Sequence, residues 1–261
     1  DDDTAADSEA SATADDSAAA EGSATAEATG DTASAAEPAG EGITIALGSE
    51  PTSLDPHTVD DGGERAVNDN IYETLLARDA AGALIPGLAS ELPTQVDPTT
   101  WEFTLREGVT FHDGSAFNAD AVVASVTRIV RLIAETKTDN DGFFGSLTGA
   151  EKVDDLTVRI TTAEPDGVLP SRMYWLKMVA PGTEASDDLS DAPNGTGPYT
   201  FVERVTGSNV TLAANADYWG GAPSIPTVRY EFAEESATRL AGLSSGKYDL
   251  ITNLAPQDTG Q

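Results

Sequence analysis

The 261-residue sequence contains no cysteine, which excludes disulfide bonds, thiolate metal sites and a cysteine nucleophile. Bases are also scarce, since 14 Lys and Arg stand against 45 Asp and Glu and give a net charge of −31 at pH 7. A surface of this charge repels phosphate groups, which argues against nucleic acid and anionic lipid as partners. No apolar run approaches the roughly 20 residues that a membrane-spanning helix needs.

Residues 1–41 differ in composition from the rest of the chain. They contain 15 Ala, 12 Asp or Glu and 10 Ser or Thr, but no Lys, Arg, Val, Ile, Leu or aromatic residue. Such a segment buries too little apolar surface to offset the entropy of ordering it, so it is predicted to be disordered. As a flexible coil it would reach roughly 35 Å. A low-complexity leader without a function is the alternative interpretation.

From residue 42 onward, hydrophobic patterns predict strands and helices that alternate along the chain. Strands are predicted over 43–47, 101–105, 156–160, 199–205, 210–212, 228–232 and 248–251, and helices over 65–76, 118–133 and 235–243. Because these elements alternate without regular βαβ repeats, the sequence predicts an α/β fold built on a mixed sheet.

Residues 101–125, WEFTLREGVTFHDGSAFNADAVVAS, are the most informative segment. Trp101 and Phe103 alternate with polar residues as in a half-buried strand, residues 112–115 form a predicted turn, and Asn118 is placed to cap the following helix. The segment also resembles, almost residue for residue, the pattern FxLRxGVxFHDGxxxxAxDVxxS. This pattern is typical of the family 5 extracytoplasmic solute-binding proteins, the receptors of ABC importers.

Further segments resemble the same family, in the family's order. They are SEPTSLDPH at 49–57, NGTGPY at 194–199 and NADYWGG at 215–221, followed by ATRL at 237–240 and GKYD at 246–249. The resemblance thus extends over about residues 43 to 254. One departure is Ala121, where the family usually has Asp. We interpret the motif residues Gly108, Gly114, Gly197, Tyr218 and Trp219 as fold determinants more than ligand contacts.

The resemblance implies lobe I of a type II periplasmic-binding-protein-like fold, with a mixed sheet and an inserted subdomain. Residues 42–83 would be the first segment of its outer part, 84–190 the inserted subdomain, and 191–261 the second outer segment, which ends near the hinge. Lobe II would follow the counterpart of residues 254–256, so we expect it to be absent from this chain. Residues 1–41 would be the acidic tether of a lipoprotein, at the cell surface or in the periplasm.

The function implied by the resemblance is that of the substrate-binding component of an ABC importer. Its partners would be a peptide and the membrane permease, and the full-length protein would be monomeric and without a cofactor. Receptors for nickel chelates, heme or oligosaccharides occur among the relatives and remain alternatives. A rival of another class is an acid hydrolase, which would need two carboxyl groups roughly 5–10 Å apart. A lobe reused as a surface interaction module is a third hypothesis.

Candidate ligand contacts also follow from the resemblance, because the segment after LDPH enters the cleft in the relatives. These candidates are Thr58, Val59, Asp60, Asp61, Gly62, Gly63 and Glu64, together with Phe143, Phe144, Trp175 and Lys177 of the inserted subdomain. Ordinary packing is the alternative interpretation of the last four.

No metal site is predicted from the sequence. His57 and His112, the only histidines, lack metal-ligand spacing and fall in predicted turns. Residues 137–148 faintly resemble a calcium loop, but Lys137 and Thr148 replace its first and last acidic ligands.

Overall fold

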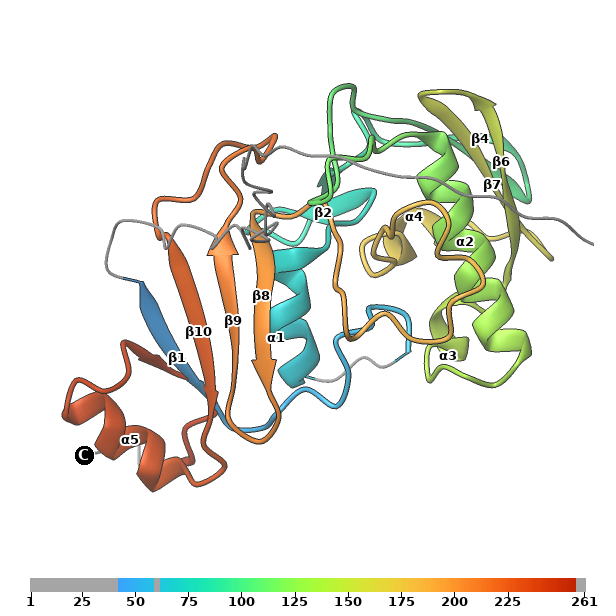
Figure 1. Ribbon diagram of the computed structural model, residues 1–261. Helices are drawn as coiled ribbons and strands as arrows, with labels where there is room; N and C mark the ends of the chain where they lie inside the picture. The colour runs from blue at the N-terminus through green and yellow to red at the C-terminus, as the bar shows by residue number, and fades with distance from the viewer. Residues whose placement is uncertain (1–41, 59–61, 257–261) are drawn as a thin grey trace, which may run out of the picture. The chain divides into compact units, whose positions relative to one another are not determined.

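The computed structural model describes residues 42–58 and 62–256. Strands from the beginning and the end of this part of the chain form a five-stranded mixed sheet (Figure 1). Its strands, in spatial order, are β11 (Leu250–Ile251), β1 (Ile43–Leu47), β10 (Thr227–Phe232), β9 (Asn209–Ala214) and β8 (Tyr199–Val205). β1 runs parallel to both of its neighbours, whereas β10, β9 and β8 pair antiparallel. The predicted mixed sheet is therefore confirmed.

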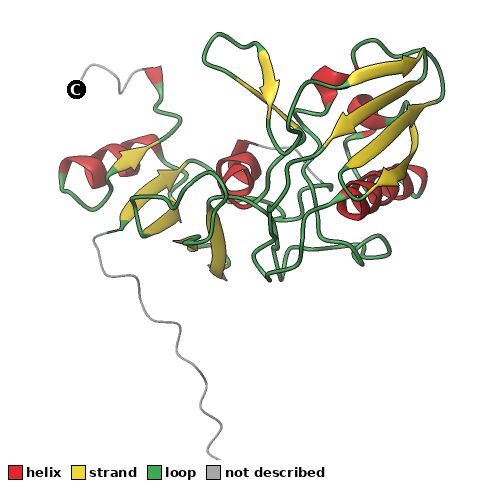
Figure 2. Ribbon diagram, turned by 90° about the horizontal axis from the view of Figure 1, so that it is seen from above, coloured by secondary structure: helices red, strands yellow, loops and turns green. Residues whose placement is uncertain are grey.

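A second sheet, antiparallel and four-stranded, comes from the middle of the sequence. Its spatial order is β4 (Thr94–Asp97), β5 (Thr100–Thr104), β7 (Thr157–Thr162) and β6 (Leu147–Asp154). Helix α2 (Ala119–Ala134) lies against this sheet and buries Val122, Val126 and Ile129 (Figure 2). The Asn118 side chain accepts hydrogen bonds from the N–H groups of Asp120 and Ala121, as the predicted cap requires.

Shorter elements lie between the longer ones along the chain. They are the hairpin of β2 (Leu76–Arg78) and β3 (Leu84–Pro86), and the one-turn helices α3 (Asp141–Phe144) and α4 (Leu169–Arg172). Helix α5 (Ser236–Ser244) precedes β11 and ends before Gly246, which has a φ of 75°. In the described part of the chain, no helix has both the length and the apolar character needed to cross a membrane.

The helix predicted over 65–76 is wrong at both ends, because α1 spans Gly62–Ile71. The helix ends where the carbonyl of Ile71 accepts a hydrogen bond from the Gly197 N–H, at 2.9 Å. Leu76 then pairs with Pro86 in the β2–β3 hairpin. Leu75 and Leu76 are fully buried, as expected from their apolar side chains, but they follow the helix and are not part of it. The last strand is also shorter than predicted, since β11 covers Leu250–Ile251 alone.

The NGTGPY segment packs tightly against the end of α1. A Cβ atom built on Gly195 would lie 2.0 Å from the Ile71 carbonyl oxygen, and one on Gly197 would lie 2.6 Å from that of Asn70. The carbonyl of Gly195 accepts from the His112 N–H at 2.9 Å, so the HDGS turn joins the same contact. Glycine is therefore required here by close backbone approach.

An ion pair between Asp55 and Arg128 is buried where the LDPH segment meets α2. Both side chains are fully buried, and the guanidinium donates to Oδ1 at 2.9 Å and to Oδ2 at 2.5 Å. The same carboxylate accepts from the backbone N–H groups of His57 and Leu189, both at 2.9 Å. The pair therefore joins helix α2 to two loops that are remote in sequence.

We expect Arg128→Met to lower the free energy of unfolding by about 3–5 kcal/mol, because it leaves Asp55 as an uncompensated buried charge. Urea denaturation at pH 7 measures the effect. The double variant Asp55→Asn with Arg128→Met removes both charges and should be more stable than the single variant. A single variant as stable as the wild type would contradict a structural role for the pair.

We expect Gly195→Ala to destabilise the protein by about 1–3 kcal/mol, because its methyl group would overlap the Ile71 carbonyl. Gly149→Ala is the matched control, since no atom lies within 4 Å of a Cβ built at that strand position. Thermal denaturation of both variants measures the difference in stability. Equal melting temperatures would show that the backbone at Gly195 moves away from the Ile71 carbonyl without a loss of stability.

Candidate functional site

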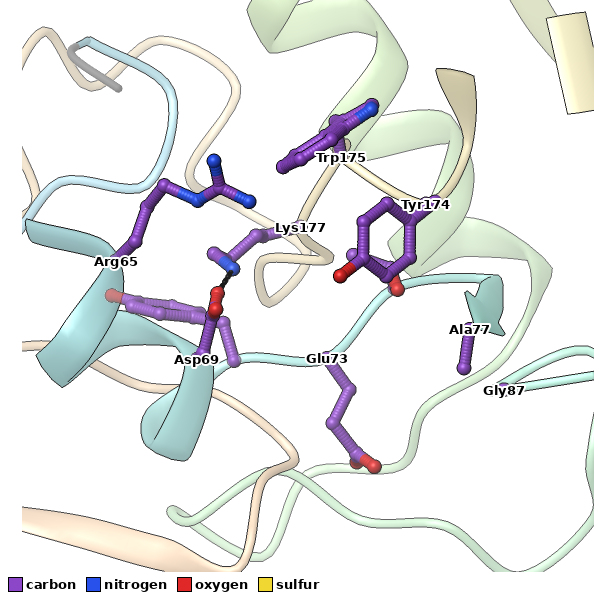
Figure 3. A pocket seen from close by; sticks show the side chains of 10 residues that line it. Arg65, Asp69, Glu73, Ala77, Gly87, Tyr174, Trp175 and Lys177 are labelled. Atoms are coloured by element: carbon purple, nitrogen blue, oxygen red, sulfur yellow. Dashed lines mark hydrogen bonds and ion pairs between the residues drawn. The ribbon is translucent and has the colours of Figure 1, made fainter. Parts of the chain in front are cut away.

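Two adjoining cavities, of about 230 Å³ and about 20 Å³, share a wall made by Arg65, Trp175 and Lys177. Together they are called the groove below, and Figure 3 shows the larger one. The larger cavity is completed by Asp69, Tyr72, Glu73, Thr74, Ala77, Gly87 and Tyr174, and the smaller by Pro56, Glu64, Asn140, Phe143 and Phe144. The lining combines aromatic rings with charges of both signs, as ligand sites commonly do.

Helix α1 supplies one wall of the groove. Arg65 and Asp69 are four residues apart and therefore lie on one face of the helix. Both side chains extend from α1 toward the cavity, on the side opposite Tyr174 and Trp175 (Figure 3). The C-terminal end of the helix and the segment after it place Glu73 at the base of the same cavity.

Lys177 is the cation at the centre of the groove, and its ammonium contacts the Asp69 carboxylate (Figure 3). The Lys177 side chain is 11% exposed, while that of Asp69 is 52% exposed, so the pair is open on the Asp69 side. The Lys177 backbone is fixed twice, by a β-bridge to Thr74 and by a 2.8 Å hydrogen bond between its carbonyl and His57 Nε2. The position of this cation is thus set by the fold.

Aromatic rings form the opposite wall. The Arg65 guanidinium lies over the Trp175 ring at 4.0 Å from its centroid, a cation–π contact that orients both side chains. The Tyr174 and Trp175 rings meet edge to face with centroids 4.6 Å apart, and Phe143 lies 6.2 Å from Trp175. Arg78 approaches the Tyr174 ring at 5.3 Å. A guanidinium group therefore lies over the Trp175 ring and another over the Tyr174 ring.

Glu73 points away from the Asp69–Lys177 pair and serves another purpose (Figure 3). Its carboxylate accepts hydrogen bonds from Thr196 Oγ1, Tyr218 Oη and Trp219 Nε1, each at 2.8 Å. Burial raises the pKa of Glu73 even though these three donors oppose the shift. These contacts hold the NGTGPY and NADYWGG segments against the end of α1, which fits the interpretation of Tyr218 and Trp219 as fold determinants.

Five of the predicted contact residues lie together in the groove: Glu64, Phe143, Phe144, Trp175 and Lys177. Among them Phe143 is 42% exposed and Phe144 is buried. Their role as ligand contacts remains a prediction.

Thr58, Gly62 and Gly63, which are also predicted contacts, do not line the groove. The Thr58 hydroxyl donates to Ser53 Oγ at 3.3 Å, inside its own loop. Gly62 and Gly63 line a separate cavity beside Thr252, and a Cβ on Gly63 would lie 3.2 Å from the Ser49 carbonyl oxygen. The Gly63 backbone therefore lies close to the backbone of Ser49, in a cavity other than the groove. Val59, Asp60 and Asp61 lie outside the described residues.

Arg65, Asp69 and Tyr174 line the groove but were not predicted. The helical spacing of Arg65 and Asp69 next to the predicted loop was an available signal. Tyr174 precedes Trp175 directly, but nothing in the sequence says which of two adjacent rings faces a cavity.

Both histidines bond to backbone carbonyls, His57 to Lys177 at 2.8 Å and His112 to Gly197 at 2.9 Å, each through Nε2. Over residues 42–58 and 62–256, no group of three or more His, Asp or Glu side chains is arranged to hold a metal ion.

The stability of the protein should fall as the pH falls from about 6.5 to 4, partly because of His57. Burial, with a contribution from the nearby Arg128 charge, lowers the pKa of His57 to about 4. Between the ordinary pKa of about 6.5 and this value, His57 binds a proton in the unfolded chain but not in the folded protein. The free energy of unfolding therefore falls by up to about 1.4 kcal/mol for each pH unit of acidification. Above pH 6.5 His57 is neutral in both states and contributes no slope.

Urea denaturation from pH 7 to 4.5 tests this dependence. The slope of unfolding free energy against pH should be shallower in His57→Asn than in the wild type, whereas the exposed-site control Asp217→Asn should keep the wild-type slope. Identical slopes in His57→Asn and the wild type would show that His57 does not titrate in this range.

The family described as bacterial extracellular solute-binding proteins, family 5 Middle, matches residues 83–261. Among curated relatives, the glutathione-binding protein GsiB of Pectobacterium atrosepticum is 33% identical over 214 residues, which make up 80% of this chain and 41% of the relative. The chain spans about two fifths of the length of the curated relatives that it matches.

Solved structures with the same fold include the periplasmic binding protein DppA from Helicobacter pylori in complex with the peptide STSA. It superposes with a TM-score of 0.74 at 25% identity, over 84% of this chain and 48% of that chain. The nickel ABC transporter protein from Bacillus halodurans gives a TM-score of 0.72 at 29% identity, over 84% of this chain and 45% of that chain.

Proposed function

Because the chain belongs to the bacterial extracellular solute-binding proteins of family 5, we propose that it is part of the substrate-binding component of an ABC importer. The solute in this proposal is a peptide, which the protein captures outside the cell and delivers to a membrane permease. Residues 42–83 and 191–261 would form the outer part of lobe I, and 84–190 its inserted subdomain. Residues 1–41 would be an acidic tether to a lipid anchor.

The observation that carries the proposal is the composition of the groove. Asp69 and Lys177 place opposite charges side by side, and Trp175 and Tyr174 present ring faces next to them. A peptide has both kinds of group, since its ends are charged and its side chains and main chain can lie on aromatic rings. The relatives support this choice, because GsiB is named for glutathione and DppA was solved with a tetrapeptide.

The proposed role is binding without chemistry. The similar proteins are solute-binding proteins and not enzymes. The family description calls its members extracellular. We propose further that the full-length protein acts as a monomer, in which a second lobe closes over the groove and removes the solute from water.

Mass spectrometry of the solute that co-purifies with the full-length protein tests the peptide assignment directly. We expect a set of short peptides in the bound fraction and none after denaturation and refolding in peptide-free buffer. A metal chelate, a heme or an oligosaccharide in the bound fraction would replace the peptide proposal with one of these alternatives.

Trp175→Ala in the full-length protein should weaken peptide binding roughly tenfold, because it removes a ring that lines both cavities and that holds the Arg65 guanidinium in place through a cation–π contact worth about 1–2 kcal/mol. Leu92→Ala is the control, since Leu92 is 52% exposed and does not line the groove. Isothermal titration with the co-purified peptide gives both affinities. Wild-type affinity in Trp175→Ala would place the peptide outside the groove.

A further inference from the structure

Asn194 is followed directly by a glycine, and it is the only asparagine of the 261 residues that is. Because glycine has no Cβ atom, its backbone nitrogen approaches the preceding side-chain amide with little steric hindrance. In a flexible chain, an asparagine before glycine is therefore the asparagine that most readily loses its amide group. This reactivity falls inside the NGTGPY segment.

The reaction needs no other reactant than water. The backbone nitrogen of Gly195 attacks Cγ of Asn194, so a C–N bond forms and the side-chain nitrogen leaves as ammonia, which takes up the proton of the Gly195 N–H. Water then opens the resulting succinimide ring at one of its two carbonyl carbons. The product is aspartate or isoaspartate at position 194, and nothing is oxidised or reduced.

In the folded protein, Asp113 of the HDGS turn holds the side-chain amide of Asn194. The amide donates from Nδ2 to Asp113 Oδ2 at 2.9 Å, and its Oδ1 accepts from the Asp113 N–H at 3.3 Å. Formation of the succinimide expels Nδ2 and reorients Oδ1. Both hydrogen bonds therefore oppose the reaction as long as the contact between Asn194 and Asp113 is closed.

The attacking residue, Gly195, is also held in place. Its carbonyl accepts from the His112 N–H at 2.9 Å. A Cβ atom built on Gly195 would lie 2.0 Å from the Ile71 carbonyl oxygen, so the backbone at this position is packed against the end of α1. Movement of the Gly195 nitrogen toward Cγ of Asn194 therefore requires a local opening of the NGTGPY segment.

We propose that Asn194 is a site of spontaneous deamidation that the contact with Asp113 protects, so that it reacts in molecules in which this contact has opened. Asp113 is the protecting residue in this proposal, and reclosing of the contact restores the protection. The inference does not depend on the solute that the groove binds.

Neither product fits the closed contact. Aspartate at position 194 lacks the donor for Asp113 Oδ2 and places a second carboxylate beside it. Hydrogen bonds from Ser115 keep the pKa of Asp113 below its ordinary value, so both groups are charged at neutral pH and repel each other. Isoaspartate lengthens the backbone by one carbon atom next to Gly195, where a methyl group already has no room.

The reaction also affects the groove. Thr196, the second residue after Asn194, donates from Oγ1 to the Glu73 carboxylate at 2.8 Å, and Glu73 lines the larger cavity. A product that displaces the NGTGPY segment therefore weakens one of the contacts that hold this wall. Deamidation at one position thus connects the chemical age of the protein to the state of its groove.

Mass spectrometry of the full-length protein incubated at pH 8 tests the protection. Tryptic cleavage after Lys177 and Arg204 releases residues 178–204, in which Asn194 is the only asparagine. We expect deamidation in this peptide to be at least about tenfold slower in the folded protein than in the same protein unfolded in urea, because only the opened fraction of folded molecules reacts. Equal rates in the folded and the unfolded protein would overturn the proposal.

Asp113→Ala should accelerate deamidation of the folded protein roughly tenfold, because loss of a charge-assisted hydrogen bond favours the open contact by about that factor. Asp79→Ala is the matched control, since the Asp79 carboxylate holds the N–H groups of Ala81 and Ala83 in a different turn. A folded Asp113→Ala variant that reacts no faster than the wild type would overturn the protecting role. If this variant does not fold, the comparison of folded and urea-unfolded wild type still decides.

Thermal denaturation of Asn194→Asp and Asn194→Ala at pH 7 tests the effect of the aspartate product. Both variants lose the amide, but only the first adds a charge next to Asp113. We expect Asn194→Asp to have the lower melting temperature of the two. An equal or higher melting temperature of Asn194→Asp would show that aspartate fits the closed contact, and would overturn this part of the inference.

Discussion

The buried ion pair between Asp55 and Arg128 is the interaction on which the rest of the groove depends. It fixes the LDPH segment on helix α2, and the same carboxylate holds the backbone N–H of His57. His57 in turn holds the carbonyl of Lys177, so four bonded groups, from Arg128 through Asp55 and His57 to Lys177, connect helix α2 with the cation in the groove. Replacing the pair by apolar residues could preserve the stability of the protein, but it would remove the acceptor that orients His57. The pair is therefore best understood as a positioning device.

The end of helix α1 is a second point at which remote segments meet. Gly195 and Gly197 contact the last carbonyl groups of the helix. Two residues beyond the helix, the Glu73 carboxylate accepts hydrogen bonds from Thr196, Tyr218 and Trp219. Three of the segments that carry the family resemblance, the HDGS turn, NGTGPY and NADYWGG, thus meet in one packed junction at the end of α1. Close backbone approach explains their glycines, and the need to satisfy the buried Glu73 carboxylate explains Thr196, Tyr218 and Trp219.

The sequence predicted those features that local patterns determine. The mixed sheet, the capped helix after Asn118 and the helix end before Gly246 were all read from periodicity and capping residues. The extent of α1 was predicted wrongly, because a tertiary hydrogen bond to Ile71 ends the helix and local propensity cannot show it. Only part of the groove was predicted, because its residues are also brought together by tertiary contacts. Aromatic and basic candidates were found by resemblance, whereas Asp69 is recognisable as a site residue only once Lys177 is placed beside it.

Two contacts hold the main chain of Lys177, the groove cation, in place. The β-bridge to Thr74 and the hydrogen bond from His57 both end on main-chain atoms of Lys177, and neither depends on its side chain. A substitution at this position would therefore change what the groove recognises while the frame around it stays in place. The same frame could serve different solutes in different descendants of one ancestor, and specificity could change in evolution by single steps that spare folding.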